Sequence, residues 1–206
     1  MKTLRYIFMG LMLLLFTPVG HTQTPVAAKQ VITLQCVPGH APDKQLSASK
    51  EILLRRLAAM GIRDAMITQQ TGASGLVVTV GDTISRKTLS DLLLIQGHMC
   101  LGESIHEQDV KEAHGDFTDP GHAVLCITLK EEAWKRWEDV TISHKNQPVD
   151  FVIDSKVYGS PRIADKISHG QISLSGSGFS KVEVRKLVAI LSFGTLPLKF
   201  TIVDNH

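Results

Sequence analysis

The most constraining part of this 206-residue chain is the stretch from Gly178 to Val203. Ser180 and Glu183 fit a capping box, in which the hydroxyl accepts a backbone N–H and the carboxylate reaches back to another. Apolar residues then recur at helical spacing, at Val184, Leu187, Val188 and Leu191. Gly194 suits the left-handed residue that ends a helix, and Pro197 prevents the helix from continuing. The stretch therefore predicts a capped helix followed by a closing strand.

A hairpin is predicted just before this helix. Val149–Ile153 has the pattern of a strand, Asp154 and Ser155 suit a tight turn, and Lys156–Tyr158 runs back. Pro161 should end the pairing or confine it to a sheet edge, because proline has no N–H to donate. The predicted order is hairpin, Gly-rich loop, capped helix and strand.

That order, with these residues, resembles the first periplasmic domain of SecD, a membrane subunit of the bacterial protein-export machinery. The hairpin carries one block of the resemblance, at Val152, Ile153, Asp154, Ser155, Lys156, Val157, Gly159 and Pro161. The helix and the last strand carry the other, at Gly178, Phe179, Ser180, Glu183, Leu187, Leu191, Gly194, Leu196, Pro197, Ile202 and Val203. The departures from the family pattern are Val182, Ser192 and Lys199.

The resemblance implies a non-enzymatic periplasmic protein that contacts unfolded or translocating polypeptide, or the Sec membrane complex. An exposed sheet edge or a groove beside a helix would accept an extended peptide. The alternative is an exported ferredoxin-like binding or assembly module with an unrelated protein partner. The matched residues have structural roles, so the resemblance transfers no functional residue.

The first 22 residues are expected to be a signal peptide. Lys2 and Arg5 form the charged start, Ile7–Phe16 the apolar core, and small residues follow. Its removal predicts a periplasmic or secreted protein that is not integral to the membrane, although an uncleaved N-terminal anchor is the alternative. The chain has 22 bases and 20 acids, so the segment's two bases account for the whole excess. Net charge thus gives no case for a nucleic-acid partner.

The rest of the chain predicts an α+β fold of two ferredoxin-like (βαββαβ) units with antiparallel sheets. Residues 23–104 form the N-terminal unit, with helices from Ser47 to Met60 and from Ser85 to Ile95, and His98–Leu101 as the fourth strand. Residues 105–121 are expected to be a polar linker. Residues 122–206 form the second, SecD-like unit, with a helix over Lys130–Val140.

The chain offers few candidates for chemistry. Four histidines recur every eight residues, at His98, His106, His114 and His122, but this spacing matches no compact metal motif. The loop at Gly176–Gly178 lacks the lysine of a phosphate-binding loop, and no serine lies in a nucleophile elbow. We therefore expect no catalytic residue, no metal and no cofactor.

Two groups of residues remain open in function. Trp134, Arg136 and Trp137 on the third predicted helix are candidates for partner contact, because tryptophan and arginine dominate interface hot spots. The alternative is that one tryptophan packs on the sheet. Three cysteines, Cys36, Cys100 and Cys126, leave one unpaired at best. A Cys36–Cys100 disulfide requires neighbouring strands, and three buried thiols are the favoured alternative.

Overall fold

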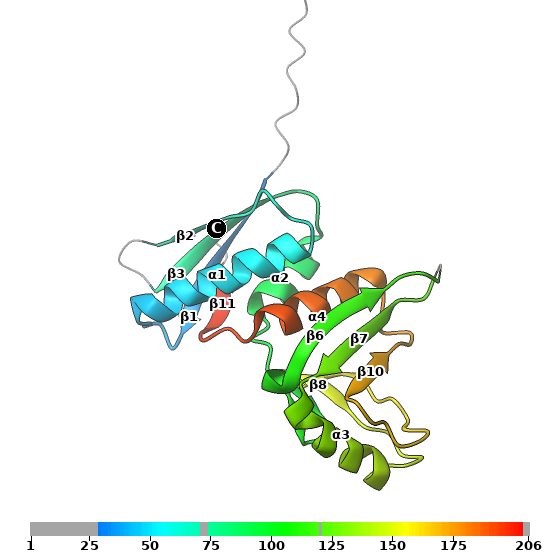
Figure 1. Cartoon of the computed structure of the whole chain (residues 1–206). Helices are drawn as coiled ribbons and strands as arrows, with labels where there is room; N and C mark the ends of the chain where they lie inside the picture. Colours follow the sequence, from blue (N-terminus) through cyan, green and yellow to red (C-terminus); the bar gives the residue numbers. More distant parts are fainter. Residues whose placement is uncertain (1–28, 71–73, 120, 204–206) are drawn as a thin grey trace, which may run out of the picture.

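The first sheet of the protein brings together the first and the last strand of the described residues. A computed structural model describes residues 29–70, 74–119 and 121–203. The sheet has the order β11-β1-β3-β2, with every neighbouring pair antiparallel. Its strands are β1 (Lys29–Val37), β2 (Met66–Gln69), β3 (Gly75–Gly81) and β11 (Lys199–Val203). Helices α1 (Asp43–Ala59) and α2 (Arg86–Leu94) cover one face, α1 over β2 and α2 over β11 (Figure 1).

The fourth strand of this sheet is not the predicted one. Residues 98–101 were expected to close the first unit, but β4 (Met99–Leu101) pairs with β5 and β8 in a different sheet. β11 takes the place instead, and its Phe200 buries its side chain, as does Leu198 just before the strand. That prediction is wrong because the alternation of apolar residues indicates that a segment is a strand, but it does not indicate which distant strand is its partner.

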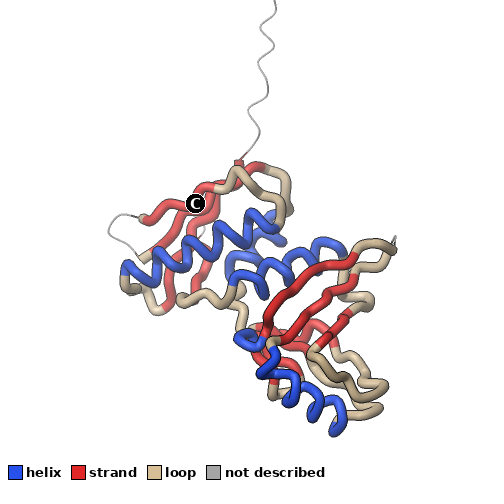
Figure 2. Tube along the Cα trace, viewed as in Figure 1, coloured by secondary structure: helices blue, strands red, loops and turns tan. Residues whose placement is uncertain are grey.

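Two smaller sheets form the rest of the molecule. One has the order β5-β4-β8-β9 and the other the order β10-β7-β6. The strands are β5 (Ile105–His106), β6 (Val110–Asp116), β7 (Val124–Leu129), β8 (Phe151–Ile153), β9 (Lys156–Gly159) and β10 (Gln171–Leu174). Helix α4 (Lys181–Phe193) lies between α1 and the strands β6 and β7, and α3 (Glu131–Ser143) lies at the far end (Figures 1 and 2).

The segment 105–121 is not a linker. It holds β5, the 3-10 turn η1 (Glu107–Asp109) and β6, which pairs along its length with β7. Its polar composition misled the prediction because β6 is an edge strand, whose outward side chains can be charged. Ala113 supplies the inward contact and is buried.

Locally encoded features agree with the sequence. Ser180 caps α4 by accepting the N–H of Glu183 at 3.1 Å, whereas the Glu183 carboxylate, predicted to complete a capping box, pairs with Lys186 at 3.0 Å. Gly194 ends the helix with a φ of 78°. The predicted hairpin is β8–β9 with its turn at Asp154 and Ser155. Helix α1 starts at Asp43 rather than at Ser47, because Pro42 supplies the helix-entry conformation one turn earlier.

The α+β class with antiparallel sheets is confirmed. The order of the first sheet is compatible with a ferredoxin-like unit, although its fourth strand comes from the other end of the chain. The strands of residues 122–206 are divided among all three sheets. Buried side chains from all parts of the described chain form one hydrophobic core. Among the described helices, none combines the length and apolar character that a bilayer crossing requires.

Candidate functional site

The chain passes twice between the first sheet and the rest of the molecule, and the two passages touch. One runs from α2 to β4 through residues 95–98, and the other from α4 to β11 through residues 194–198. The backbone N–H of Leu196 donates to the carbonyl of Gln96 at 2.8 Å. Residues near these two passages are therefore positioned both by the first sheet and by the rest of the molecule.

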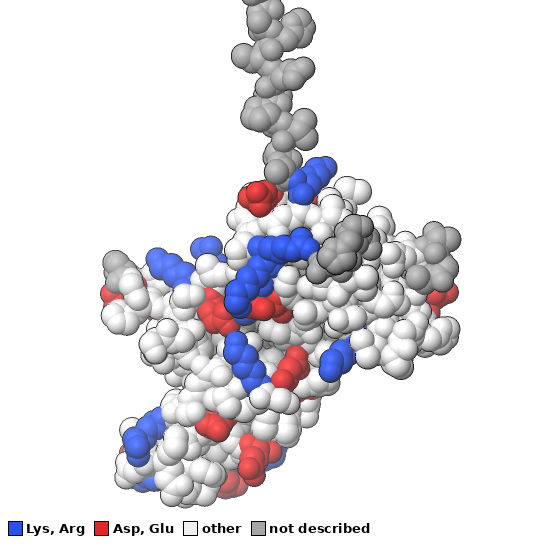
Figure 3. Space-filling view, turned by 180° about the vertical axis from the view of Figure 1, so that it is seen from behind, with Lys and Arg blue, Asp and Glu red and all other residues white. Residues whose placement is uncertain are grey.

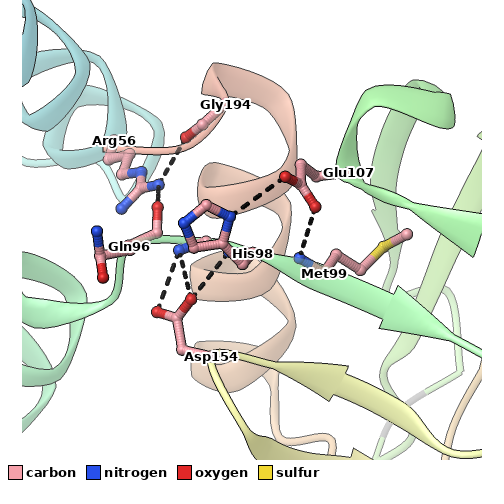
Figure 4. Close-up of polar contacts among 8 residues, drawn as sticks. Arg56, Gln96, His98, Met99, Glu107, Asp154 and Gly194 are labelled. Carbon is pink, nitrogen blue, oxygen red and sulfur yellow. Dashed lines mark hydrogen bonds and ion pairs between the residues drawn. The ribbon is translucent and has the colours of Figure 1, made fainter. Parts of the chain in front are cut away.

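Arg56 of α1 holds both passages. Its guanidinium donates to the carbonyl oxygens of Ile95 at 2.5 Å, Gln96 at 2.8 Å and Gly194 at 2.6 Å. Figure 4 shows the contacts with Gln96 and Gly194. The side chain is completely buried. Desolvation lowers the pKa of Arg56 to about 10, and the charge of Asp154 opposes that shift. The guanidinium thus remains charged at neutral pH and satisfies three carbonyls in the interior.

The turn of the β8–β9 hairpin is tied to the first passage. Asp154 and Ser155 have φ values of 48° and 68°, the left-handed pair that a tight two-residue hairpin needs. The Asp154 carboxylate accepts the N–H groups of Gly97 at 3.0 Å and His98 at 2.9 Å. Figure 4 shows Glu107 beside them, where it accepts the N–H of Met99 at 3.0 Å. These contacts fix the hairpin tip against residues 97–99.

A groove opens beside this turn, between α2, α4 and the hairpin. We call it the junction groove, a hollow of about 280 Å³ lined by Lys87, Asp91, Leu94, Ile95, Ile153, Asp154, Lys156, Tyr158 and Lys186. Its apolar lining comes from Leu94, Ile95, Ile153 and the Tyr158 ring. A second hollow of about 580 Å³ shares Leu94 and Asp154 with it. The two hollows therefore adjoin each other at the tip of the β8–β9 hairpin, and both apolar and charged side chains line them.

Most charges of the junction groove are already paired. Lys186 is 2% exposed and lies 3.0 Å from Glu183 and 4.0 Å from Asp91. Asp91 also accepts Lys87 at 2.8 Å. Burial, together with Glu183 and Asp91, raises the pKa of Tyr158 to about 12. The phenol therefore stays neutral at physiological pH and can both donate and accept a hydrogen bond.

An open strand edge lies along the groove. β9 pairs with β8 on one side, and no other described strand pairs with it. Val157 on this strand is 52% exposed. An unpaired edge presents backbone N–H and C=O groups that can bind an extended chain. The arrangement combines the two features of peptide recognition by strand addition, which are an edge for the backbone and a hollow for side chains.

The predicted contact residues lie elsewhere, on α3. Trp137 is 1% exposed, so it packs in the core and is corrected from a partner contact to a core residue. Trp134 is partly buried and its indole N–H donates to the carbonyl of Leu129 at 3.1 Å. Arg136 donates to both carboxylate oxygens of Asp109 and to the carbonyl of Ser104. Contact of Trp134 and Arg136 with a partner stays a prediction.

The regularly spaced histidines do not converge. His98 pairs with Glu107 at 3.3 Å and His122 with Asp119 at 2.9 Å. His106 lies opposite Cys100 across β4 and β5, and His114 lies opposite Cys126 across β6 and β7. Within the described ranges, no three His, Cys, Asp or Glu side chains are grouped as metal ligands.

The cysteines are unpaired. Cys36 lies in β1 and Cys100 in β4, two strands of different sheets, so the condition for a Cys36–Cys100 disulfide is not met. Cys36 is buried, whereas Cys100 and Cys126 are partly exposed. The favoured alternative of three buried thiols therefore holds for Cys36 alone.

Sequence reasoning missed Arg56 and Lys186, although both carry a signal. Arg56 lies at helical spacing with Leu53, Leu57 and Met60, on the apolar face of α1. Lys186 immediately precedes Leu187 of the buried stripe of α4, and it is itself buried. A charged residue inside an apolar stripe predicts a paired, buried charge, and this is what both residues form.

Comparisons with known proteins point to one family. A family model described as the SecDF P1 head subdomain matches residues 96–198, which is half of the chain. The matched range begins and ends at the two passages that Arg56 holds. SecD of Acidaminococcus fermentans is 23% identical over 173 residues, and SecD of Dictyoglomus turgidum is 25% identical over 186 residues. The matches cover 80% and 85% of this chain but only 40% and 45% of those relatives.

Solved structures agree with the fold. The crystal structure of SecDF in its super-membrane-facing form matches with a TM-score of 0.67 and 18% identity, covering 86% of this chain and 30% of that one. A SecDF structure described as a membrane component that enhances protein export matches with a TM-score of 0.61 and 17% identity, covering 86% and 99%. At these identities the similarity shows a shared fold.

Proposed function

The chain belongs to the SecDF P1 head subdomain family, and from this premise we propose that it binds extended polypeptide during protein export. It would do so on the outer side of the cytoplasmic membrane, where its apolar N-terminal segment would deliver or tether it. The proposal assigns no catalytic step. The relatives are named as protein translocase subunits, so the Sec membrane complex is the second partner in the proposal.

The single observation that supports this function is the open edge of β9 beside the junction groove. An unfolded segment offers backbone donors and acceptors, which the edge can pair, and exposed apolar side chains, which the groove can cover. The edge is short, at four residues from Lys156 to Gly159. An edge of this length favours weak and transient binding, because few backbone hydrogen bonds form and little surface area is buried.

Site-specific photocrosslinking in cells tests the proposal. A photoreactive residue replaces Val157 at the β9 edge, and a second strain carries it at Ile142 on α3, which is equally exposed at 52%. We expect crosslinks from position 157 to exported chains during their translocation, and far fewer from position 142. Equal yields from both positions, or crosslinks at 157 to one folded protein outside the export machinery, would reject the proposal.

A further inference from the structure

The first sheet has one face that lies away from its two helices. Alternate residues of a strand point to opposite sides, and Ile32, Leu34 and Cys36 of β1 are buried on the side of α1 and α2. Val31 and Val37 alternate with them and are exposed. They therefore belong to the opposite side of the sheet, which we call the open face.

Strand register places uncharged side chains in adjacent rows on the open face. Val31 lies opposite Thr79 of β3, and Thr79 lies opposite Met66 of β2. The next row crosses all four strands, with Val203, Thr33, Val77 and Thr68. Eight large apolar side chains are exposed in the described residues, and half of them lie here, namely Val31, Val37, Met66 and Val203. Exposed apolar surface is thus concentrated on this one face.

The charged side chains near the open face lie at its margins. They are Lys29, Asp64, Arg86 and Lys199. Figure 3, seen from behind, shows the area over this sheet as largely white. The outer face of the β10-β7-β6 sheet differs, because β6 exposes Glu112, His114 and Asp116 there. Polar residues of that kind are usual on a solvated sheet face, whereas an apolar centre with a charged rim is typical of a protein interface.

We propose that the open face binds the open face of a second copy of this chain. Two packed sheets lie about 10 Å apart with their side chains interdigitated, and valine and threonine suit such a surface. A two-fold axis sets the uncharged rows of the two copies against each other, so no charge is buried at the centre. A partner with charges in its contact surface would bury them there without an opposite charge to pair with.

The size of the open face predicts a weak dimer. The strands β1, β2, β3 and β11 have 9, 4, 7 and 5 residues. At about 3.3 Å per residue and about 4.8 Å between strands, the flat area of the sheet is about 400 Å². Two such faces bury about 800 Å² before the relief of the side chains is counted, which is the range of transient complexes. The dimer leaves the junction groove accessible, because α2 lies on the other side of the sheet.

Sedimentation equilibrium of the purified protein tests the proposal. We expect a reversible monomer–dimer equilibrium with a dissociation constant of about 10 μM or weaker. On dilution, the methyl resonances of residues 31, 77 and 203 should shift along with the fraction of dimer. A protein that remains monomeric up to about 1 mM overturns the proposal, as do shifts confined to other surfaces.

Charge variants locate the interface. Val31→Lys and Met66→Lys should each weaken the dimer at least about tenfold, because the two-fold axis brings two unpaired lysines into the interface. Ile142→Lys is the matched control, since Ile142 on α3 is as exposed as Val31, both at 52%; it should dimerise like the wild type. Val31→Thr keeps the branched shape without a charge and should change the dissociation constant by less than about threefold. Circular dichroism establishes that each variant is folded.

The remaining outcomes each contradict the proposal. A dimer that persists in both Val31→Lys and Met66→Lys forms through another surface. A loss of dimer in Ile142→Lys equal to that in Val31→Lys would place the contact on α3. A monomer whose methyl groups at residues 31, 77 and 203 are shielded from a soluble paramagnetic probe would show that another segment of the same chain covers the open face.

Discussion

Arg56 shows how one buried side chain can hold two distant parts of a chain together. Lysine could not replace it well, because a guanidinium offers five donors in a fixed plane and an ammonium is a point charge. Its three carbonyl partners come from residues 95, 96 and 194. The desolvation of the charge is compensated only while all three are in place.

Replacement of Arg56 should therefore be costly. Arg56→Met leaves three carbonyls without a donor in the interior, and we expect it to lower the free energy of unfolding by about 3 kcal/mol or more. Arg56→Lys should lose about half as much. Urea unfolding followed by circular dichroism measures the change. Arg55→Met is the control, since Arg55 is exposed beside Glu51 and should change the stability by less than about 0.5 kcal/mol. Similar losses at both positions would contradict the role of Arg56.

Tyr158 gives a prediction for alkaline pH. Burial and the carboxylates of Glu183 and Asp91 raise its pKa to about 12 in the folded protein, whereas an unfolded tyrosine titrates near 10. Because the folded pKa is the higher one, the stabilisation is complete below about pH 10 and is lost as the pH rises towards 12. Tyr158→Phe should remove this part of the pH dependence.

The titration can be observed directly. Tyr6 and Tyr158 are the two tyrosines of the chain, so a protein without residues 1–22 reports Tyr158 alone in its phenolate absorbance. We expect the midpoint near 12 while circular dichroism still shows the native fold. A midpoint near 10 in folded protein would mean that water reaches the phenol freely.

Local elements of the fold were predictable where the sequence itself carries the geometry. The cap at Ser180, the stop at Gly194 and the turn at Asp154 and Ser155 each depend on neighbours within a few residues, and all three are found. The start of α1 was misplaced because two helix-entry signals, Pro42 and Ser47, lie close together and only packing decides between them.

The cap of α4 should contribute measurably to stability. Ser180→Ala removes the hydroxyl that accepts the Glu183 N–H, and we expect a loss of about 1 kcal/mol in the free energy of unfolding. Ser192→Ala in the same helix is the control. Ser192 is exposed near the end of α4, and alanine favours a helix slightly. Thermal and urea unfolding of the two variants measure the difference, and equal stabilities would show that the cap is dispensable.

Over the whole chain, the relation between distant segments could not be predicted. The alternation of Lys199–Val203 predicts a strand, but nothing within it indicates that β1 is its partner. The junction groove could not be predicted from the sequence either, because α2, α4 and the β8–β9 hairpin come together only through the two passages between the first sheet and the rest of the molecule. The charged residues within apolar stripes, Arg56 and Lys186, were the available signal that helices from different halves pack together.

The pairing of β11 with β1 predicts how the protein can be divided. Residues 29–98 contain three strands and both helices of the first sheet, but they lack β11 with its buried Phe200, and they lack the buried Leu198 just before it. Losing two such side chains costs about 4 kcal/mol or more in transfer free energy, which is comparable with the whole stability of a small domain. This fragment should therefore remain largely unfolded.

A rearranged chain should restore the fold. Because Arg56 donates to the carbonyls of both Gln96 and Gly194, a short Gly-Ser linker can join residue 96 to residue 194, keep all three partners of Arg56 and bring β11 back into the sheet. We expect residues 29–96 joined in this way to 194–203 to give dispersed amide resonances and a cooperative thermal transition, unlike the fragment 29–98. The same rearranged chain with Phe200→Asp should fail to fold, because it places a charge in the core. Independent folding of 29–98 would show that β11 is an accessory strand rather than the one that completes the sheet.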